Sequence, residues 1–489
     1  MNTTCAAEAA SARRRFRAAS ALALCMFLTA CITPPKVAPV EEPIDQRVDL
    51  GLGPVAAPAE DTWWTAYEDA QLDRLVASAL ADNPTMGEAL ARLRLAKAEV
   101  DATSAQLWPY VSYDAAMNRE RISGKAPIPA QYAGSSVWLG NELLNFSWAL
   151  DFWGRQRSLV RQAGGRADAA ALDAAAARLA IVSAMVRTYI DLESSYRLAD
   201  VAGREEEQRR QILEITRHRF RAGLDTSVEL RQAEGAVPEA RVERLADEAA
   251  IDRDVHLLAA LAGRGAAEYS RIQRPKPLAK TALSLPTALP MDLLARRPDV
   301  LAARSRISAA QAGLAVARDD FYPNFNLLAF GGTVGVGKFA NLFQGQAATW
   351  GVGPALDLPL FDAGRRKANY RAKAADVDLA VTAYNGTVLA AVRETSDQLS
   401  DIESLDASLT QLRQSLDDAE TAYRLAIERY KAGLTTYLTV LVTETQVFDA
   451  QRQQVDLQSA RASARVNLLI DVGGDFKPDS PSVALNTGR

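Results

Sequence analysis

The residue types that usually carry out chemistry are scarce in this chain. Its 489 residues include two histidines and three cysteines, too few for a metal site that needs three or four such ligands. No nucleophile has a recognisable general base near it in the sequence. We therefore expect no catalytic residue, no metal and no cofactor.

One cysteine, Cys31, has the surroundings of a lipidation site. A basic segment at 13–17 precedes an apolar stretch at 18–30, and the cysteine completes the sequence LTAC. This layout resembles a bacterial lipoprotein signal, in which residues 1–30 are removed and Cys31 becomes the acylated first residue. An ordinary secretory signal that is cut nearby is the alternative. Ile32, in place of aspartate, indicates the outer rather than the inner membrane.

A second motif, GTVGVGK at 332–338, has the glycine and lysine spacing of a phosphate-binding loop. Such a loop needs Ser or Thr after the lysine, but Phe339 stands there and no helix is evident behind it. We therefore interpret the motif as an external loop.

The sequence RFRAGL at 219–224 returns almost unchanged as RYKAGL at 429–434. Other stretches recur in the same order, LWPY as FYPN and ALDFWGR as ALDLPLFDAGR. We infer two copies of one unit, at 83–263 and 298–473. The remaining segments are predicted to be a signal peptide, a lipid anchor with an extended tether, a proline-rich connection and a tail, at 1–30, 31–82, 264–297 and 474–489.

Each copy is predicted to contain one very long helix. The stretches 155–221 and 365–431 lack proline and are rich in helix-forming residues. At 1.5 Å per residue each would be about 100 Å long. Shorter helices are predicted after each glycine turn and before each pair of strands, at about 226–262, 436–471, 84–107 and 299–321.

Between the helices, apolar residues recur at every second position. Four strands are predicted, at about 109–118, 142–151, 323–332 and 349–360. Their alternation of apolar with small or polar residues is typical of outer-membrane strands, and a soluble hairpin packed on the helices is the alternative. No uninterrupted apolar run of about 20 residues follows Cys31, so a membrane crossing would use strands.

Four strands cannot close a barrel by themselves. Because an open sheet leaves unpaired N–H and C=O groups in hydrocarbon, several chains must pool their strands. Two chains would give about eight strands and a barrel filled with side chains, whereas three would give twelve strands and a lumen. We expect a homotrimer.

Together these features resemble the outer-membrane efflux proteins, the trimeric channel-tunnels of Gram-negative bacteria, and in particular their lipoprotein branch. The resemblance spans nearly all of the mature chain and is carried by LARRPDV (294–300), Tyr322-Pro323, LDFWGR (150–155) and the two AGL turns. It implies a mainly α fold with a transmembrane β-barrel of twelve strands, continuous with a long α-helical tunnel. Residues 264–297 and the chain ends would form an equatorial belt.

The resemblance also implies that both turns contact the helical hairpins of a periplasmic adaptor. The residues assigned to this contact are Ala222, Gly223, Leu224, Thr226, Ala432, Gly433, Leu434 and Thr436. The glycines suit the positive φ of a helix C-cap, and the leucines would be exposed apolar tips, six in each trimer. Helix capping alone is the alternative interpretation.

A periplasmic gate is implied just beyond the turns. Glu229 matches an acidic gate position and Leu438 an apolar one, with Arg231 as the candidate charge partner of Glu229. Val442 and Thr445 stand where some relatives carry an acidic residue and an arginine, so closure by charge pairing departs from the family pattern. An ordinary solvated helix position is the alternative for Glu229.

The predicted function is that of a passive outer-membrane exit duct in a tripartite efflux system that exports drugs or other small toxic compounds. The implied partners are a periplasmic membrane-fusion adaptor, an inner-membrane pump, expected to be proton-coupled, and outer-membrane lipid. The chain would be lipid-anchored in the outer membrane and extend into the periplasm. Its net charge of −4 argues against a nucleic acid as partner. A lipid-anchored coiled-coil tether and a duct for type I protein secretion are the alternatives.

Overall fold

The computed structural model describes residues 34–35, 37, 39–44, 62–125, 132–277, 296–337 and 339–474. The chain divides into two compact units. Unit 1 combines residues 1–43, 94–169 and 304–383, and unit 2 combines 44–93, 170–303 and 384–489. Cys31 and the predicted signal peptide lie outside the described residues.

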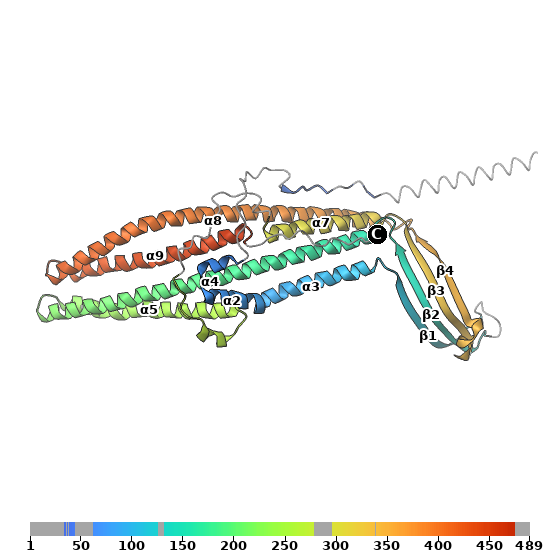
Figure 1. Ribbon diagram of the computed structural model, residues 1–489, viewed down its shortest axis with the longest axis horizontal. Helices are drawn as coiled ribbons and strands as arrows, with labels where there is room; N and C mark the ends of the chain where they lie inside the picture. The colour runs from blue at the N-terminus through green and yellow to red at the C-terminus, as the bar shows by residue number, and fades with distance from the viewer. Residues whose placement is uncertain are drawn as a thin grey trace, which may run out of the picture. The chain divides into compact units, whose positions relative to one another are not determined.

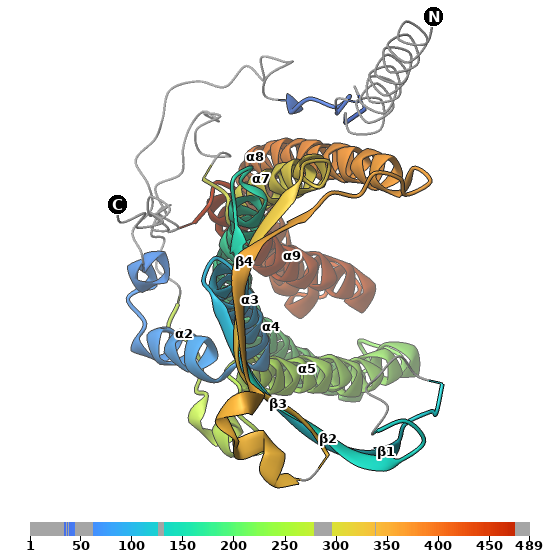
Figure 2. The same cartoon turned by 90° about the vertical axis from the view of Figure 1, so that its right-hand side faces the viewer.

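The helices come in matched pairs, one member from each copy (Figure 1). The pairs are α3 (Pro84–Ala105) with α7 (Pro298–Asp319), α4 (Arg155–Arg221) with α8 (Arg365–Lys431), and α5 (Ser227–Leu261) with α9 (Tyr437–Asp471). The two long helices, α4 and α8, have 67 residues each and occupy the residues at which the sequence predicts them. Figures 1 and 2 show α5 beside α4 and α9 beside α8, so each long helix and its shorter successor form a hairpin.

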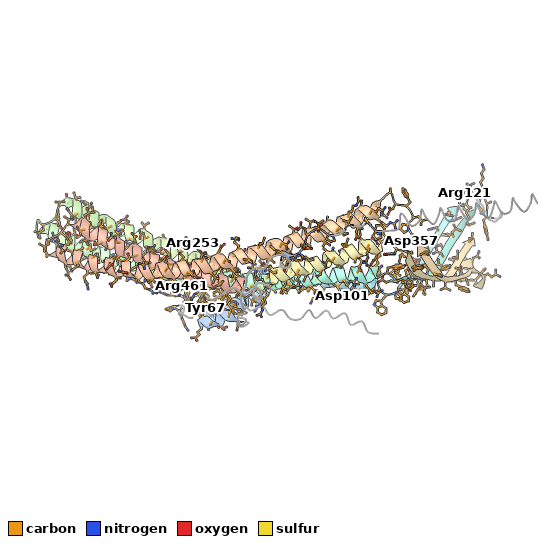
Figure 3. The ribbon with its side chains drawn as sticks, turned by 90° about the horizontal axis from the view of Figure 1, so that it is seen from above. Tyr67, Asp101, Arg121, Arg253, Asp357 and Arg461 are labelled. Atoms are coloured by element: carbon orange, nitrogen blue, oxygen red, sulfur yellow. The ribbon has the colours of Figure 1, made fainter. Side chains whose placement is uncertain are left out.

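The α8–α9 hairpin is held by charged side chains as well as by its apolar contacts. The Nε atom of Arg461 on α9, a residue labelled in Figure 3, lies 2.5 Å from Oδ1 of Asp406 on α8. Ile402 on α8 is buried with Leu468 on α9 in one apolar cluster. These contacts join the C-terminal half of α9 to the middle of α8.

The strands form one antiparallel sheet in the order β1-β2-β3-β4. They are β1 (Tyr110–Arg121), β2 (Ser136–Leu150), β3 (Asn324–Gly337) and β4 (Ala348–Asp357). A mainly α chain with four antiparallel strands, two from each copy, confirms the predicted fold class. The first three strands extend several residues beyond their predicted ranges, and β4 ends three residues earlier than predicted.

The pairing register collects the alternating apolar residues on one face of the sheet. Successive residues of a strand point to opposite faces, so residues in register share a face. Two neighbouring rows on the same face are Val111, Phe146, Ala329 and Val352, and Tyr113, Leu144, Gly331 and Trp350. On the opposite face the Asn145 amide donates a hydrogen bond of 2.6 Å to the carboxylate of Asp114. One face of the sheet is thus apolar, and the other carries polar groups.

The GTVGVGK motif is not a loop, so that interpretation is wrong. Its glycines up to Gly337 belong to β3. A Cβ at Gly332 would lie 1.9 Å from the carbonyl oxygen of Glu142, so glycine is required there by close contact with β2. A strand of this kind cannot wrap a phosphate.

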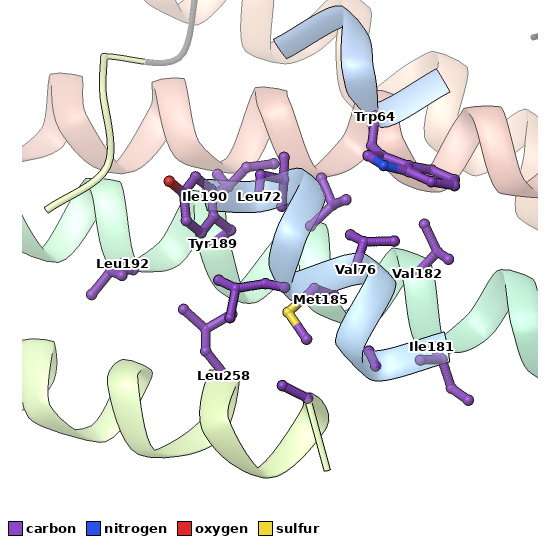
Figure 4. Close-up of a cluster of buried hydrophobic side chains, with 14 of the residues drawn as sticks. Trp64, Leu72, Val76, Ile181, Val182, Met185, Tyr189, Ile190, Leu192 and Leu258 are labelled. Atoms are coloured by element: carbon purple, nitrogen blue, oxygen red, sulfur yellow. The ribbon is translucent and has the colours of Figure 1, made fainter. Parts of the chain in front are cut away.

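The predicted extended tether at 31–82 is also partly wrong, because it contains a helix. α2 (Ala70–Asp82) begins at Asp69, whose side chain accepts a hydrogen bond from the Gln71 amide. Its Leu72 and Val76 pack against Met185 of α4 and Leu258 of α5 (Figure 4). Burying such aliphatic side chains stabilises the fold by about 1.5–3 kcal/mol each, so α2 is part of the core of unit 2.

Within the described residues, one helix passes the length and composition test for a membrane span, namely α4. Core helices of soluble proteins pass the same test. The apolar residues of α4 between Ile181 and Leu192 belong to the buried core that α2 and α5 complete. We therefore assign this stretch to helix packing.

Candidate functional site: the two hairpin turns

Each long helix ends in a turn closed by two backbone hydrogen bonds. Gly223 has a φ of 71° and Gly433 a φ of 77°. The amide of Leu224 donates to the Arg219 carbonyl at 2.9 Å, and the amide of Gly223 donates to the Phe220 carbonyl at 3.0 Å. The second turn repeats both bonds. This is the Schellman motif, in which a residue with positive φ ends a helix.

All eight residues assigned to the adaptor contact are exposed in the structure. Leu224 has 63% of its surface exposed and Leu434 has 68%. In a C-terminal turn of this type the residue after the glycine often packs back on its helix, but here both leucines extend into solvent. Two exposed leucines at matching turns form an apolar surface suited to a partner.

The two turns differ in how the following helix begins. Thr226 is the N-cap of α5 and forms a capping box with Glu229, whose side chain accepts a hydrogen bond of 2.9 Å from the Thr226 amide. Thr436 is the N-cap of α9, and its side chain forms no capping hydrogen bond. The start of α5 is therefore fixed by side chains, whereas the start of α9 is not.

Four side chains tie the two turns together, and we call them the inter-turn cluster: Thr216, Arg219, Asp225 and Tyr430. The Arg219 guanidinium donates to both carboxylate oxygens of Asp225 at 3.0 and 3.1 Å, and to the Tyr430 carbonyl at 2.7 Å. The Tyr430 hydroxyl donates to Asp225 at 2.6 Å and lies 3.0 Å from the Thr216 hydroxyl. The Arg219 guanidinium also lies 4.5 Å from the centre of the Tyr430 ring.

Electrostatics within the inter-turn cluster favour its paired state. The hydrogen bond between Arg219 and Asp225 raises the pKa of Arg219 above its ordinary value. Burial, helped by the bond to Asp225, raises the pKa of Tyr430 to about 12. Both residues therefore keep their protons, and remain donors, at any pH near neutrality.

Sequence reasoning missed this cluster, although a signal for it was present. Tyr430 occupies the place of Phe220 in the repeat, and Asp225 occupies the place of Thr435. Those two differences put a phenol on one turn and a carboxylate on the other. Comparing the copies position by position would have identified the residues, but not their contact.

The predicted gate residues do not meet in the structure. Arg231 pairs with Glu234 at 2.8 Å, whereas Glu229 belongs to the capping box of α5. Leu438 is exposed on the first turn of α9. Val442 is exposed as well, and the Thr445 hydroxyl donates to the Leu441 carbonyl at 3.0 Å. The Glu229 and Arg231 side chains thus have separate partners in this chain.

The segment that follows Cys31 is bound to α8. In unit 1 the amides of Val40 and Glu41 both donate to the Asp378 carboxylate, at 2.8 and 3.0 Å. The Tyr370 hydroxyl donates to the Val37 carbonyl at 3.4 Å. In unit 2 the Ile44 amide donates to the Asn385 side chain at 2.8 Å. Side chains of α8 therefore fix the described part of this segment at several points.

The other residue types that could bind a metal or take part in catalysis have structural roles. Among the described residues no group of three or more His, Cys, Asp or Glu is arranged to hold a metal. The His256 ring lies 4.4 Å from the ring of Tyr269, which is a packing contact.

Comparisons with known proteins agree on one family. A family model described as "Outer membrane efflux protein" matches residues 75–264 and 289–474. The fusaric acid resistance protein FusA of Burkholderia cepacia is 36% identical over 322 residues, which cover 65% of this chain and 61% of FusA. The pyoverdine export outer membrane protein OpmQ of Pseudomonas aeruginosa is 29% identical over 479 residues, covering 95% of this chain and 98% of OpmQ.

A solved structure shows the same fold. The outer membrane protein VceC of Vibrio cholerae aligns with a TM-score of 0.80 at 31% identity, covering 86% of this chain and 100% of VceC.

Proposed function

This chain belongs to the outer membrane efflux protein family, and on that premise we propose that three copies form the outer-membrane exit duct of a tripartite efflux system. Proteins of this family are outer-membrane efflux channels and not enzymes. The observation that carries the proposal is the four-stranded sheet, which has an apolar face and two unpaired edges, β1 and β4, among the described strands.

The edges of this sheet are the reason to propose a trimer. In hydrocarbon each unpaired N–H or C=O group costs several kcal/mol, so β1 and β4 must pair with strands of other copies. Trp350 and Val352 on β4, like Tyr113 on β1, are exposed in the single chain and suit contact with lipid. Three copies supply twelve strands, enough to leave a lumen.

The hairpin turns are proposed as the docking surface for a periplasmic adaptor. In support, Leu224 and Leu434 are exposed in the turns that end α4 and α8. These are the helices that follow β2 and β4 in the chain. A trimer would present six such turns. The inter-turn cluster would keep the two turns of each chain at a fixed spacing, which a multimeric adaptor requires.

A periplasmic gate next to the turns remains our proposal. Glu229 would place a negative charge at the start of α5, and Leu438 an apolar group at the start of α9. The hydrogen bond from Thr226 lowers the pKa of Glu229, so its carboxylate stays ionised near neutrality. Arg231 would add a positive charge to the gate while it is paired with Glu234, and it would not pair with Glu229.

Lipid attachment at Cys31 is proposed from its sequence context and from the tether. Val37 is six residues after Cys31 and contacts Tyr370, which lies in the second turn of α8. Six residues reach at most about 20 Å. Since α8 begins shortly after β4 ends, an acyl chain on Cys31 could enter the same membrane as the strands.

For the system as a whole, we infer an adaptor and an inner-membrane pump as partners. The resemblance to the lipoprotein branch favours a proton-coupled drug pump. The names of FusA and OpmQ refer to fusaric acid resistance and pyoverdine export, which supports small organic compounds as the exported class here.

Two measurements test the proposal together. Purified protein reconstituted in planar lipid bilayers should give discrete single-channel currents, and a deletion strain should become more susceptible to small toxic compounds until the gene is restored. A coiled-coil tether would pass no current. A protein-secretion duct would conduct, but its deletion would leave susceptibility unchanged while a secreted protein disappeared from the medium.

A further inference from the structure

Away from the turns, one buried carboxylate lies where the two hairpins meet. Glu444 on α9 is 1% exposed. Its ion-pair partner is Arg209 on α4, whose Nε lies 3.8 Å from Oε2 of Glu444. The other oxygen, Oε1, is buried without a hydrogen bond of ordinary geometry among the described residues, although the Gln208 side chain faces this carboxyl and opposes part of the effect of burial on it. A carboxylate in this position is poorly compensated for its lost hydration.

Arg209 cannot neutralise Glu444 fully, because three carboxylates share it. Its guanidinium lies 2.6 Å from Glu205 on α4 and 3.2 Å from Glu239 on α5. It also donates to the Ala236 carbonyl at 3.1 Å. Glu444 has the longest of these contacts. With one cation for three carboxylates, the group with the weakest contact is the one that gains most from protonation.

The other groups that face Glu444 add little positive charge. They are Glu205 and Gln208 from α4, Tyr423 from α8 and Tyr437 from α9. Arg452 on α9 pairs instead with Glu243 at 3.3 Å and Asp247 at 3.0 Å on α5. Burial raises the pKa of Glu444 to about 7, against the opposing effect of Arg209.

Resting on the proposed channel function, we propose that Glu444 is a proton-controlled joint between the two hairpins. When its carboxyl is protonated, α9 packs closely against α4. When it is ionised, the uncompensated charge favours separation of the α8–α9 hairpin from α4–α5 and entry of water. Because the turns and the proposed gate lie a few helical turns further along the same hairpins, separation widens the periplasmic end of the channel.

The direction of the pH effect follows from the two environments. In the packed form the pKa of Glu444 is about 7, whereas in water it returns to the ordinary value of 4.5. The packed form therefore binds the proton more tightly and is favoured in acid. Between about pH 4.5 and 7, each pH unit shifts the equilibrium toward the separated form by up to about tenfold.

The test compares channel opening from pH 5 to pH 8 in planar bilayers for the wild type, Glu444→Gln and Glu239→Gln. The wild type should open more often as the pH rises. Glu444→Gln should stay at its acid level throughout, because glutamine cannot ionise. Glu239 contacts the same arginine, and its side chain is 72% exposed. Glu239→Gln removes one competitor for Arg209 and leaves Glu444 able to ionise, so this variant should keep the rise with pH and reach its midpoint at a lower pH than the wild type.

A structural measurement tests the role of Glu444 separately from the proposed channel function. Amide exchange in α9 near residue 444, corrected for intrinsic rates, should accelerate from pH 5 to pH 8 in the wild type and not in Glu444→Gln. Glu444→Met, which fills a similar volume without charge, replaces Glu444→Gln if that variant does not assemble. Absence of current in every variant would contradict the channel. Current together with equal pH responses in the wild type and the Glu444 variants would overturn the joint.

Discussion

The Tyr430 hydroxyl donates a hydrogen bond of 2.6 Å to the carboxylate of Asp225. Tyr430 is next to the last residue of α8, and Asp225 lies just beyond the turn that ends α4. The same carboxylate accepts two bonds from Arg219, which also binds the Tyr430 carbonyl. The ends of the two hairpins are therefore joined through side chains, so movement of one turn must either carry the other with it or break these bonds.

Tyr430→Phe should loosen this junction and make the channel open more readily. A hydrogen bond to a charged group contributes about 1.5–3 kcal/mol, which corresponds to roughly a 10- to 150-fold change in an equilibrium constant. Single-channel recording measures the open fraction directly. Tyr196→Phe is the control, because it removes a hydroxyl from α4 beside a different apolar cluster and leaves the bond to Asp225 in place. Equal open fractions in the two variants would show that this bond does not hold the channel closed.

Gly223→Val and Gly433→Val should abolish export while trimers still form. Both glycines have positive φ, which costs a residue with a side chain about 1–2 kcal/mol, and more for a β-branched one. The turns would rearrange and displace Leu224 and Leu434. Drug susceptibility of the complemented deletion strain measures export. Gly235→Ala, inside α5 and with open space around its Cβ position, is the control that should retain resistance. Full resistance in both valine variants would argue against docking at the turns.

Thr226→Ala and Thr436→Ala should differ in their effect on helix ends. Removing an N-cap hydroxyl costs about 1 kcal/mol. Thr226 makes that bond, and Thr436 does not. Amide exchange in the first turn of α5 should therefore speed up about fivefold in Thr226→Ala, whereas the first turn of α9 should change little in Thr436→Ala. Similar acceleration at both helices would mean that the capping box does not set the stability of this end of α5.

Cys31→Ser should remove acylation without preventing insertion, because we expect the strands to enter the membrane independently of the proposed anchor. Incorporation of radiolabelled palmitate into the purified protein is the measurement. Cys25→Ser serves as the control, since Cys25 lies in the segment predicted to be cleaved and its loss should leave the label unchanged. Label retained by Cys31→Ser would disprove the anchor.

Much of the helical part of this fold could be predicted because the ends of the helices are determined by residues close to them in the sequence. The long helices stop where Gly223 and Gly433 permit a left-handed residue, and this is readable from the residues themselves. The C-terminal part of β3 was predicted to be a loop because its glycines are typical of loops. Gly332 is needed there for contact with β2, which depends on a partner strand that no local pattern reveals.

The missed helix α2 had a readable pattern, with Leu72, Leu75, Val76 and Ala79 spaced for one helical face. The prolines upstream favour an extended chain, and α2 begins only after they end. The inter-turn cluster is a different case. Arg219 and Tyr430 belong to separate copies of the repeat, and their contact exists only because the two hairpins pack side by side. Contacts between side chains of the two repeats follow from tertiary structure and cannot be derived from the spacing of residues in the sequence.

The divergence of the two turns has a consequence for any ring of identical proteins that closes on the tip of a trimer. The first turn carries Asp225 and a capped helix, whereas the second carries Thr435 and an uncapped one. Six equal subunits would then meet two chemically distinct seats in strict alternation around the circle. Each subunit of the ring would have to bind both kinds of turn or bind in two orientations. The assembly would then have threefold symmetry, even if its six subunits were arranged as a hexagon.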